Sequence, residues 1–204
     1  MKEKETRVWR VDLEVRAGED ADTIVGYAAV FDALSEDLGG FRERIAPGAF
    51  ARSVKEENDV RALWEHNPQY VLGRTKVGTL RLEEDKTGLR VEINPPATMW
   101  AGDLMRSMRR GDVDQMSFGF YVRDEAWERD GEAGAVRTLK DVDLFDVSVV
   151  TYPAYPQTSA EARARAERVV SGQSPVAGEE KKSAARRKAA ARRRGLEVEI
   201  LREV

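Results

Sequence analysis

Hydrophobic and polar residues alternate along several short stretches of the chain, and this period of two residues predicts β-strands. The strands expected from alternation, or from short apolar and β-branched runs, span residues 7–15, 23–31, 60–64, 78–82, 88–93, 116–122 and 138–151. Two helices interrupt them: Pro47 can open a short one that ends near Asn58, and Thr98 can cap a longer one that ends at Gly111. Residues 124–137 are polar and contain glycines, which predicts a turn or mobile loop. The predicted fold class is therefore mostly β with α (α+β).

Two of the predicted strands carry polar residues at informative positions. In 116–122 the apolar side chains occupy every second position, so Ser117 and Gly119 point away from them. A serine on a polar strand face is most often an ordinary surface residue. In 138–151 the period of two residues predicts that Asp146 shares a face with Val142, Leu144, Ser148 and Val150, which sets its carboxylate among apolar neighbours. A carboxylate in such surroundings is costly unless it is paired or hydrogen-bonded.

The composition changes after the last predicted strand. Residues 159–168 and 179–194 favour helix but offer little apolar surface to bury, and residues 171–178 form a flexible link between them. We expect helices here that are marginal or that form on binding. The prediction is a globular domain of residues 1–158 followed by a charged, Ala/Arg-rich helical or disordered tail of residues 159–204.

Charge is distributed unevenly between these two parts. The net charge is -3, but residues 161–204 contain 12 Lys and Arg against 7 Asp and Glu, which leaves 22 against 30 in residues 1–160. An acidic body thus carries a basic tail, which either stays solvated or contacts acidic partner surfaces or nucleic acid. The body lacks a clustered basic and aromatic face, so nucleic acid is not an expected partner.

Several protein classes are excluded by what the sequence lacks. No apolar run approaches the length of a membrane span, and the N-terminal residues lack the apolar segment of a signal peptide. There is no cysteine, and His66 is the one histidine, so a zinc site built from those residue types is not expected. We expect a protein without membrane contact that stays in the cytosol, where disulfides are rare.

His66 is the natural general base in this chain, because imidazole exchanges protons near neutral pH. It follows the predicted strand 60–64, and catalytic groups often lie where a rigid strand meets a loop. A hydroxyl nucleophile, a base that accepts its proton and an anion that orients the base make a catalytic triad, and Ser117, His66 and Asp146 have these chemical types. The alternative is that His66 is an ordinary half-buried residue beside Trp64.

Six short segments of the chain occur together in one protein family. They are 26–32 (GYAAVFD), 43–50 (ERIAPGAF), 64–68 (WEHNP), 72–75 (LGRT), 116–120 (MSFGF) and 144–155 (LFDVSVVTYPAY). In type and order they resemble the prohead serine proteases of tailed bacteriophages, over about residues 7–158. Those enzymes process capsid and scaffold proteins inside the immature head.

The resemblance implies a role for each candidate residue. It assigns the nucleophile to Ser117 and the general base to His66. For the third member it favours Asp146, with Asp143 and Glu65 as alternatives. The related herpesvirus assembly proteases use a second histidine at this point, which this chain lacks.

The resemblance also implies a fold and a function. The fold would be a closed or partly open β-barrel core with a few peripheral helices, like that of the herpesvirus assembly proteases, followed by the basic C-terminal tail. The function would be that of a serine endopeptidase that cleaves the major capsid protein, its scaffold segment and itself through an acyl-enzyme. It would work inside the assembling prohead in the host cytoplasm, without metal or cofactor. Backbone amides near Ser117 or the side chain of Arg74 would bind the oxyanion, and a homo-oligomer is left open.

Two other functions remain open. A catalytically inactive scaffolding or capsid-binding assembly protein would keep the fold and act through its basic tail, but the presence of His66, Ser117 and an acid argues against it. A nucleic-acid-binding barrel with a basic tail is disfavoured by the acidic body.

Overall fold

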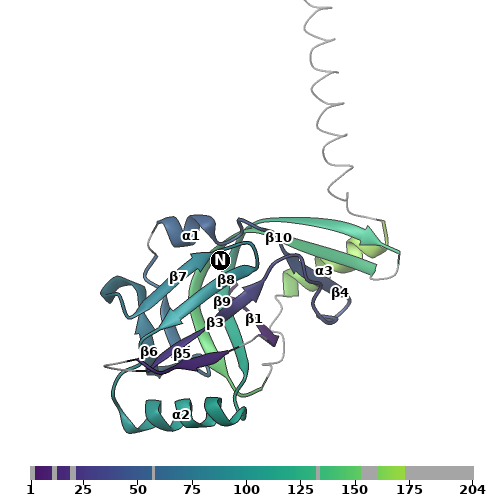
Figure 1. The fold of residues 1–204 in the computed structure, drawn as a ribbon. Helices are drawn as coiled ribbons and strands as arrows, with labels where there is room; N and C mark the ends of the chain where they lie inside the picture. Colours follow the sequence, from purple (N-terminus) through teal and green to yellow (C-terminus); the bar gives the residue numbers. More distant parts are fainter. Residues whose placement is uncertain are drawn as a thin grey trace, which may run out of the picture.

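The computed structural model describes residues 3–10, 13–18, 22–56, 58–131, 134–152 and 160–172, which form two β-sheets with helices at their ends (Figure 1). The elements are β1 (Glu5–Arg10), β2 (Glu14–Arg16), β3 (Thr23–Val30), β4 (Phe41–Ile45), α1 (Ala51–Lys55), β5 (Arg61–Trp64), β6 (Asn67–Arg74), the 3-10 helix η1 (Thr75–Val77), β7 (Leu80–Glu84), β8 (Gly88–Ile93), α2 (Met99–Arg110), β9 (Gln115–Asp130), β10 (Gly134–Val150) and α3 (Ala160–Val170). The expected hairpin of two short strands is confirmed as β7 and β8.

The larger sheet is built around β10. It has six strands in the order β1-β9-β10-β5-β6, and β4 also pairs with β10. β9 and β10 form a long antiparallel hairpin, whereas β4 and β5 run parallel to β10. The two halves of β10 have different neighbours, since residues 135–139 pair with β4 and residues 146–149 pair with β5.

The smaller sheet covers one face of the larger one. Its strands have the order β2-β3-β8-β7, and all neighbours are antiparallel. Side chains of both sheets share one apolar core, which includes Leu89 and Val91 from β8 and Phe118 and Phe120 from β9. Burying a side chain of this size stabilises a fold by about 1.5–3 kcal/mol, so this core holds the two sheets together.

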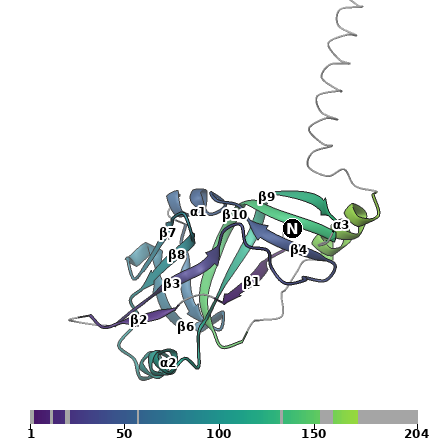
Figure 2. The ribbon, with the colours of Figure 1, turned by 45° about the vertical axis from the view of Figure 1, so that its right-hand side comes forward.

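The helices cover the ends of the sheets. α2 begins and ends as the sequence predicts: Thr98 accepts a hydrogen bond from the backbone N–H of Ala101, and Gly111 has the left-handed φ of 81° that ends the helix. Figure 2 shows α3 beside the far end of the β9–β10 hairpin, away from α2. There, Ala162 and Ala166 pack in a second apolar cluster with Trp127.

The family resemblance predicts a closed or partly open β-barrel. The closed barrel is wrong, and the partly open one stays a prediction. Within the described residues, the larger sheet ends in β1 and β6 and the smaller sheet ends in β2 and β7, and no ladder joins one sheet to the other. The sheets pack face to face through their side chains, so neither needs to close on itself. The fold is a strand-rich mixture of strands and a few helices. Its likeness to the herpesvirus assembly proteases stays a prediction.

The loop predicted for residues 124–137 is also wrong, because the long hairpin occupies this region. β9 continues to Asp130, and β10 begins at Gly134. Among the many charged residues of this segment, the side chain of Trp127 is deeply buried. Its ring centroid lies 5.0 Å from that of Phe41 on β4. The hairpin extension is stable because β4 and α3 cover this ring.

Two further elements differ in extent from the prediction. The single strand expected over residues 7–15 is two strands, β1 in the larger sheet and β2 in the smaller, with residues 11–12 outside the described part of the chain. The helix expected from Pro47 covers only α1. Gly48 has φ of 89°, a left-handed conformation that an α-helix cannot include, so the helix begins after it.

Most of the predicted tail lies outside the described residues, which include none of 173–204 and therefore none of the second expected helix. The segment 153–159 also lies outside them. The first helix expected in the tail is α3, which buries Ala162, Ala166 and Val169. These small residues recur at helical spacing, although alanine-rich sequence suggests little apolar surface. The domain boundary after residue 158 stays a prediction.

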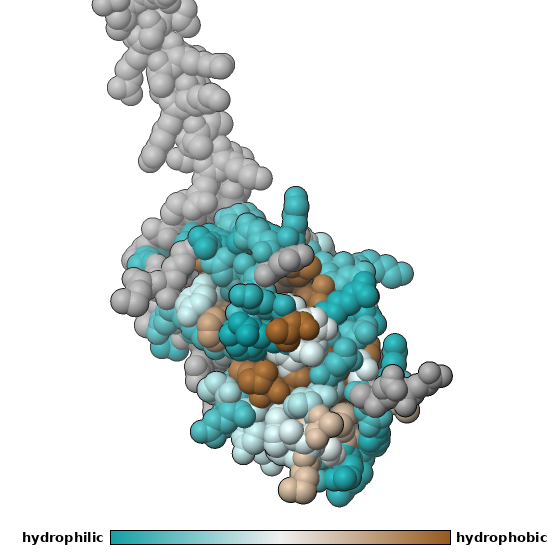
Figure 3. All heavy atoms as spheres, turned by 90° about the vertical axis from the view of Figure 1, so that its left-hand side faces the viewer, coloured by the Kyte–Doolittle hydropathy of each residue, from teal (hydrophilic) through white to brown (hydrophobic). Residues whose placement is uncertain are grey.

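The outer surface is mainly polar. Figure 3 views the side of β6 and β7 and shows small hydrophobic patches separated by hydrophilic surface. Val71 on β6, Val77 on η1 and Met99 on α2 are exposed apolar side chains. Scattered residues of this kind are normal on protein surfaces. In the part of the chain that the structure describes, no helix is long and apolar enough to cross a bilayer.

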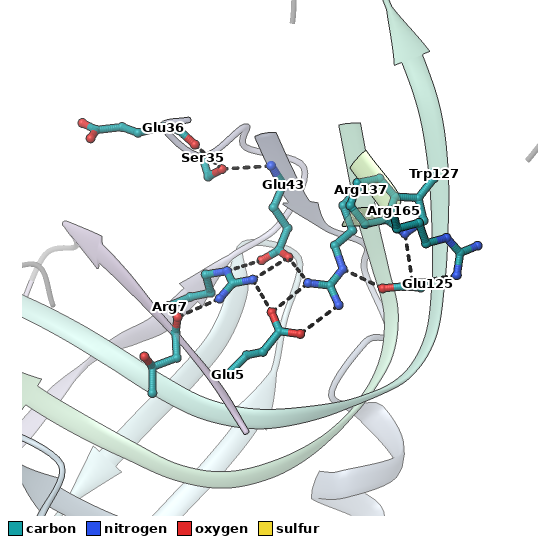
Figure 4. Close-up of polar contacts among 10 residues, drawn as sticks. Glu5, Arg7, Ser35, Glu36, Glu43, Glu125, Trp127, Arg137 and Arg165 are labelled. Carbon is teal, nitrogen blue, oxygen red and sulfur yellow. Dashed lines mark hydrogen bonds and ion pairs between the residues drawn. The ribbon is translucent and has the colours of Figure 1, made fainter. Parts of the chain in front are cut away.

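A buried ion-pair cluster links β1, β4 and β10 (Figure 4). It consists of Glu5, Arg7, Glu43 and Arg137, each at most 3% exposed. Arg7 donates two hydrogen bonds to Glu43, of 2.6 and 2.9 Å, and Arg137 donates two to Glu5, of 2.8 and 3.0 Å. Burial alone would raise the pKa of Glu5, but the hydrogen bonds and charges of Arg137 and Arg7 outweigh it and hold that pKa below its ordinary value. Glu5 is therefore an anion at neutral pH, and its ion pairs with Arg7 and Arg137 fix β1 to β10.

Candidate active site

His66 lies in the two-residue turn that joins β5 to β6. Trp64 and Asn67 pair across this turn, and Glu65 and His66 between them both have φ of 55°. Positive φ at both central positions is the mark of a type I′ turn, whose twist suits a hairpin. Neither residue is glycine, so each holds a conformation that costs about 1–2 kcal/mol. Strain of this kind is typical of functional sites, and it fixes the imidazole at the end of β5 as the sequence predicts.

Ser117 is held on β9, directly opposite Ser148 on β10. Both serines are fully buried. The residues that follow them, Phe118 and Val149, belong to the apolar core. Ser117 therefore lies on the face of the larger sheet that points away from the core, as the alternation of β9 predicts.

A bulge in β10 brings Asp146 to the same face. Leu144 pairs with Phe120 on the apolar face, whereas Asp146 pairs with Gly119, which shares its face with Ser117. The residue between Leu144 and Asp146 has no partner on β9, and one extra residue reverses the faces that the following side chains take. The expectation that Asp146 shares a face with Leu144 is therefore wrong, because the strand is not unbroken.

Ser117, His66 and Asp146 form a continuous hydrogen-bonded series. The Nε2 atom of His66 lies 2.6 Å from Oγ of Ser117, and Nδ1 is hydrogen-bonded to Oδ1 of Asp146. Since a carboxylate accepts, Nδ1 carries the hydrogen and Nε2 is free to accept the hydroxyl proton. This is the tautomer that a general base needs. Asp146 is 1% exposed and the His66 side chain 18%, so the series runs from a buried anion to a partly open imidazole.

Two further groups bind the Asp146 carboxylate. The hydroxyl of Ser148 donates to Oδ1 at 3.1 Å, and the ammonium group of Lys4 donates to Oδ2 at 2.7 Å. Burial alone would raise the pKa of Asp146. The hydrogen bond from His66 and the charge that this ring carries when protonated, and then the hydrogen bond and charge of Lys4, outweigh burial and hold that pKa below its ordinary value. Asp146 is therefore an anion at neutral pH.

The alternative acids are engaged elsewhere. Asp143 accepts hydrogen bonds from Arg123 and, at 2.5 Å, from Arg52. Glu65 accepts the backbone N–H of Thr151 at 2.6 Å. Of the three acids that the sequence offered, Asp146 is the one that the described contacts join to His66.

Arg74, which was considered as an oxyanion donor, is paired with another group. Its guanidinium donates to the two carboxylate oxygens of Asp59, at 2.6 and 2.5 Å. These bonds hold the pKa of Asp59 at about 2, mainly through the hydrogen bonds from Arg74. The positive charge of Arg74 is therefore already compensated, and its role at the oxyanion stays a prediction.

Sequence reasoning missed Ser148 and Lys4. Ser148 stands two residues after Asp146, and its position opposite Ser117 depends on the register of β10, which the sequence does not reveal. Lys4 lies 142 residues before its partner, in a charged N-terminal stretch that resembles a solvated end. The structure thus brings His66, Ser117 and Asp146 together with two additional groups, and the catalytic roles of the three stay predictions.

Comparisons with known proteins identify related chains. The prohead protease of Enterobacteria phage HK97 is 30% identical over 139 residues, which are 67% of this chain and 58% of that protein. The chain therefore spans less than two thirds of the length of this curated relative. The solved structure of the bacteriophage T4 capsid assembly protease, gp21, aligns with 74% of this chain and 98% of that chain, at 11% identity and a TM-score of 0.46.

The family described as caudovirus prohead serine protease matches residues 11–171. This range contains the turn of His66, the strand of Ser117 and the bulged strand of Asp146. Since the match extends over more than half of the sequence, the chain belongs to the caudovirus prohead serine protease family.

Proposed function

We propose that this protein is a serine endopeptidase that cleaves scaffold and capsid proteins, itself included, inside the phage prohead during head maturation. The observation that carries the proposal is the hydrogen-bonded series of Ser117, His66 and Asp146, with 2.6 Å between the hydroxyl and Nε2. The family to which the chain belongs supports the same chemistry, because its name describes a serine protease.

The proposed mechanism is acyl transfer. Oγ of Ser117 attacks the scissile carbonyl carbon while Nε2 of His66 accepts the hydroxyl proton. The Asp146 carboxylate stabilises the imidazolium so formed, which then gives its proton to the leaving amine as the peptide C–N bond breaks. A water molecule gives a proton to His66 as its oxygen attacks the acyl-enzyme ester. The imidazolium returns that proton to Oγ of Ser117 as the ester C–O bond breaks, which releases the acid and the free serine. The side chains that accept and stabilise charge in each step are already hydrogen-bonded to one another, so they need little reorganisation during the reaction.

Substrates, location and domain roles are part of the proposal. The phage HK97 relative is named a prohead protease, and the family name also refers to the prohead, which supports the major capsid protein and its scaffold segment as substrates. The site of action would be the assembling prohead in the host cytoplasm. Residues 1–158 would form the protease domain, and the basic residues 159–204 would bring the enzyme to the shell and be removed by self-cleavage.

The test is intact-mass analysis of the full chain beside Ser117→Ala and His66→Ala, each alone and each mixed with the capsid protein of the same phage. Ser53→Ala is the matched control, because Ser53 is a buried serine whose hydroxyl bonds Val142 O at 2.6 Å. Fragments are expected with the wild type and Ser53→Ala and not with the other two. Uncleaved protein in all four samples, with capsid binding retained, would instead support the inactive scaffolding protein.

A further inference from the structure

We propose that Lys4 is a positioning residue of the active site, whose ammonium group holds Asp146 and keeps His66 neutral, and thus able to accept a proton. The inference deepens the proposed function and rests on it, because it concerns the same hydrogen-bonded series. It assigns a catalytic contribution to the N-terminal segment, far in sequence from Ser117.

The contacts divide the carboxylate between its partners. Oδ1 of Asp146 accepts hydrogen bonds from His66 and Ser148, whereas Oδ2 accepts one from the ammonium group of Lys4 at 2.7 Å. A carboxylate bound at both oxygens cannot rotate about its terminal bond without losing a charged hydrogen bond. Lys4 therefore fixes the oxygen that faces the imidazole.

The site is shaped to admit this lysine. A Cβ atom on Gly119 would lie 2.6 Å from Oδ2 of Asp146 and 2.6 Å from Cε of Lys4. Only glycine leaves this space free, since real Cβ atoms do not approach other atoms so closely. The ammonium group also lies 4.1 Å from the ring centroid of Phe145, the bulged residue of β10, which is a cation–π contact. Two independent features of the larger sheet thus hold the ammonium group beside the carboxylate.

The charge balance gives Lys4 its effect. In the resting state that general-base catalysis requires, His66 is neutral, so among the described contacts of Asp146 the ammonium group of Lys4 supplies the positive charge. A carboxylate 1% exposed that loses its only cation is strongly destabilised. The unpaired carboxylate would favour the protonated, positively charged form of His66. An imidazolium cannot accept the proton of Ser117.

The other charges around Asp146 have partners of their own. Arg61 pairs with Asp146 through the backbone of β5, but its guanidinium bonds Asp59. Glu65, in the turn beside His66, binds the backbone of Thr151. Lys4 and His66 are therefore the ionisable groups hydrogen-bonded to this carboxylate among the described residues.

The first test compares the full chain with Lys4→Met, Lys4→Arg and Ser117→Ala by following cleavage of a capsid-protein peptide against pH. Lys86→Met is the matched control, an exposed lysine in the turn between β7 and β8. In Lys4→Met, kcat/KM is expected to fall about tenfold near neutral pH, the size of one charged hydrogen bond. The acid limb of its pH profile, which belongs to the coupled His66 and Asp146 pair, is expected at higher pH. Lys4→Arg restores most of the rate, and Lys86→Met matches the wild type.

A second readout does not depend on turnover. Because His66 is the one histidine, its ring proton signals in NMR report imidazolium formation directly. In Lys4→Met the imidazolium is expected to form at higher pH than in the wild type. Unchanged ring signals and an unchanged pH profile in Lys4→Met would overturn the inference. Wild type that cleaves no better than Ser117→Ala, with the NMR shift present, would instead remove the proposed function; the effect of Lys4 on His66 would stand without a catalytic meaning.

Discussion

The larger sheet carries two buried polar clusters that pair their charges in different ways. In the ion-pair cluster of Glu5, Arg7, Glu43 and Arg137, carboxylates and guanidiniums alternate, and each group binds at least two others. The cluster around His66 also contains Lys4, Ser117, Asp146 and Ser148. There, one carboxylate accepts from Lys4, His66 and Ser148, and the hydroxyl of Ser117 donates to His66. Every charge of the first cluster has opposite charges as partners, whereas the second cluster ends in a neutral hydroxyl bound to a histidine nitrogen.

The N-terminal segment contributes to both clusters, because successive residues of a strand point to opposite faces. Glu5 and Arg7 pair with Phe120 and Phe118 and so lie on the core side. Lys4 reaches the other side, where it contacts Asp146. Complete pairing of buried charges holds strands together, whereas the proposed function needs the second arrangement, in which a hydroxyl can give its proton to a histidine nitrogen. Changes in the first cluster should therefore alter stability, and changes in the second should alter catalysis.

The largest expected effect is on stability, from Arg137→Met. Arg137 binds Glu5 and Glu43 and also Glu125, which Arg165 of α3 contacts in turn. Removing one cation from a buried network leaves carboxylates unpaired, so the free energy of unfolding should fall by about 3–5 kcal/mol. Urea denaturation measures it, with the exposed Arg81→Met within about 0.5 kcal/mol of the wild type. A loss of kcat/KM per folded molecule would contradict the separation of the clusters.

Gly119→Ala should act mainly on catalysis. Its new Cβ would displace Asp146 and Lys4, and a misplacement of about 1 Å can lower activity roughly a hundredfold. Peptide hydrolysis measures the effect. Gly102→Ala in α2 is the control, because its Cβ would meet only the end of Arg106, 3.9 Å away, and alanine favours helix. Equal activity of the two variants would show that the carboxylate does not need this space.

Ser148→Ala should have a smaller catalytic effect. It removes one hydrogen bond to Asp146 and leaves Lys4 and His66 in place. A loss of about 1 kcal/mol corresponds to roughly a fivefold lower kcat/KM. Ser53→Ala, which removes an equally buried hydroxyl from a bond to Val142 O, should lower the free energy of unfolding without this loss of rate. A loss of stability without a loss of rate in Ser148→Ala would show that Ser148, like Ser53, supports the fold and not catalysis.

The smallest effect concerns acid. The pKa values of Glu5 and Asp146 lie below their ordinary values of 4.5 and 3.8, so their contribution to stability is complete above those values and is lost as pH falls through the lowered ones. Urea midpoints measured across this range should fall with pH in the wild type. In Arg137→Met the fall should be shallower, because Glu5 loses the partner that lowers its pKa most. An equal slope in both proteins would mean that Glu5 does not report on the cluster.

Local sequence patterns predicted the individual strands and helices of this molecule better than they predicted which strands become neighbours. Short apolar and alternating runs located the strand of Ser117 and the strand that precedes His66, and capping residues located α2. These signals act over only a few residues. The bulge at Phe145 left no such signal, yet it decides that Asp146 faces Ser117 and not the core. Lys4 and Ser148 depend on which strands become neighbours, which is set by the packing of the whole core. For the same reason Trp127 was hidden in a run that looked like a loop.

The central claim is that Ser117 is a nucleophile activated by His66, and labelling with a fluorophosphonate probe tests it most directly. Such probes bond covalently to activated serines, and peptide mass analysis locates the adduct. The account predicts a single adduct on Ser117 of the folded wild type, and none on His66→Ala or on protein unfolded in urea. An adduct on another serine, or equal labelling of Ser117 in His66→Ala, would contradict it.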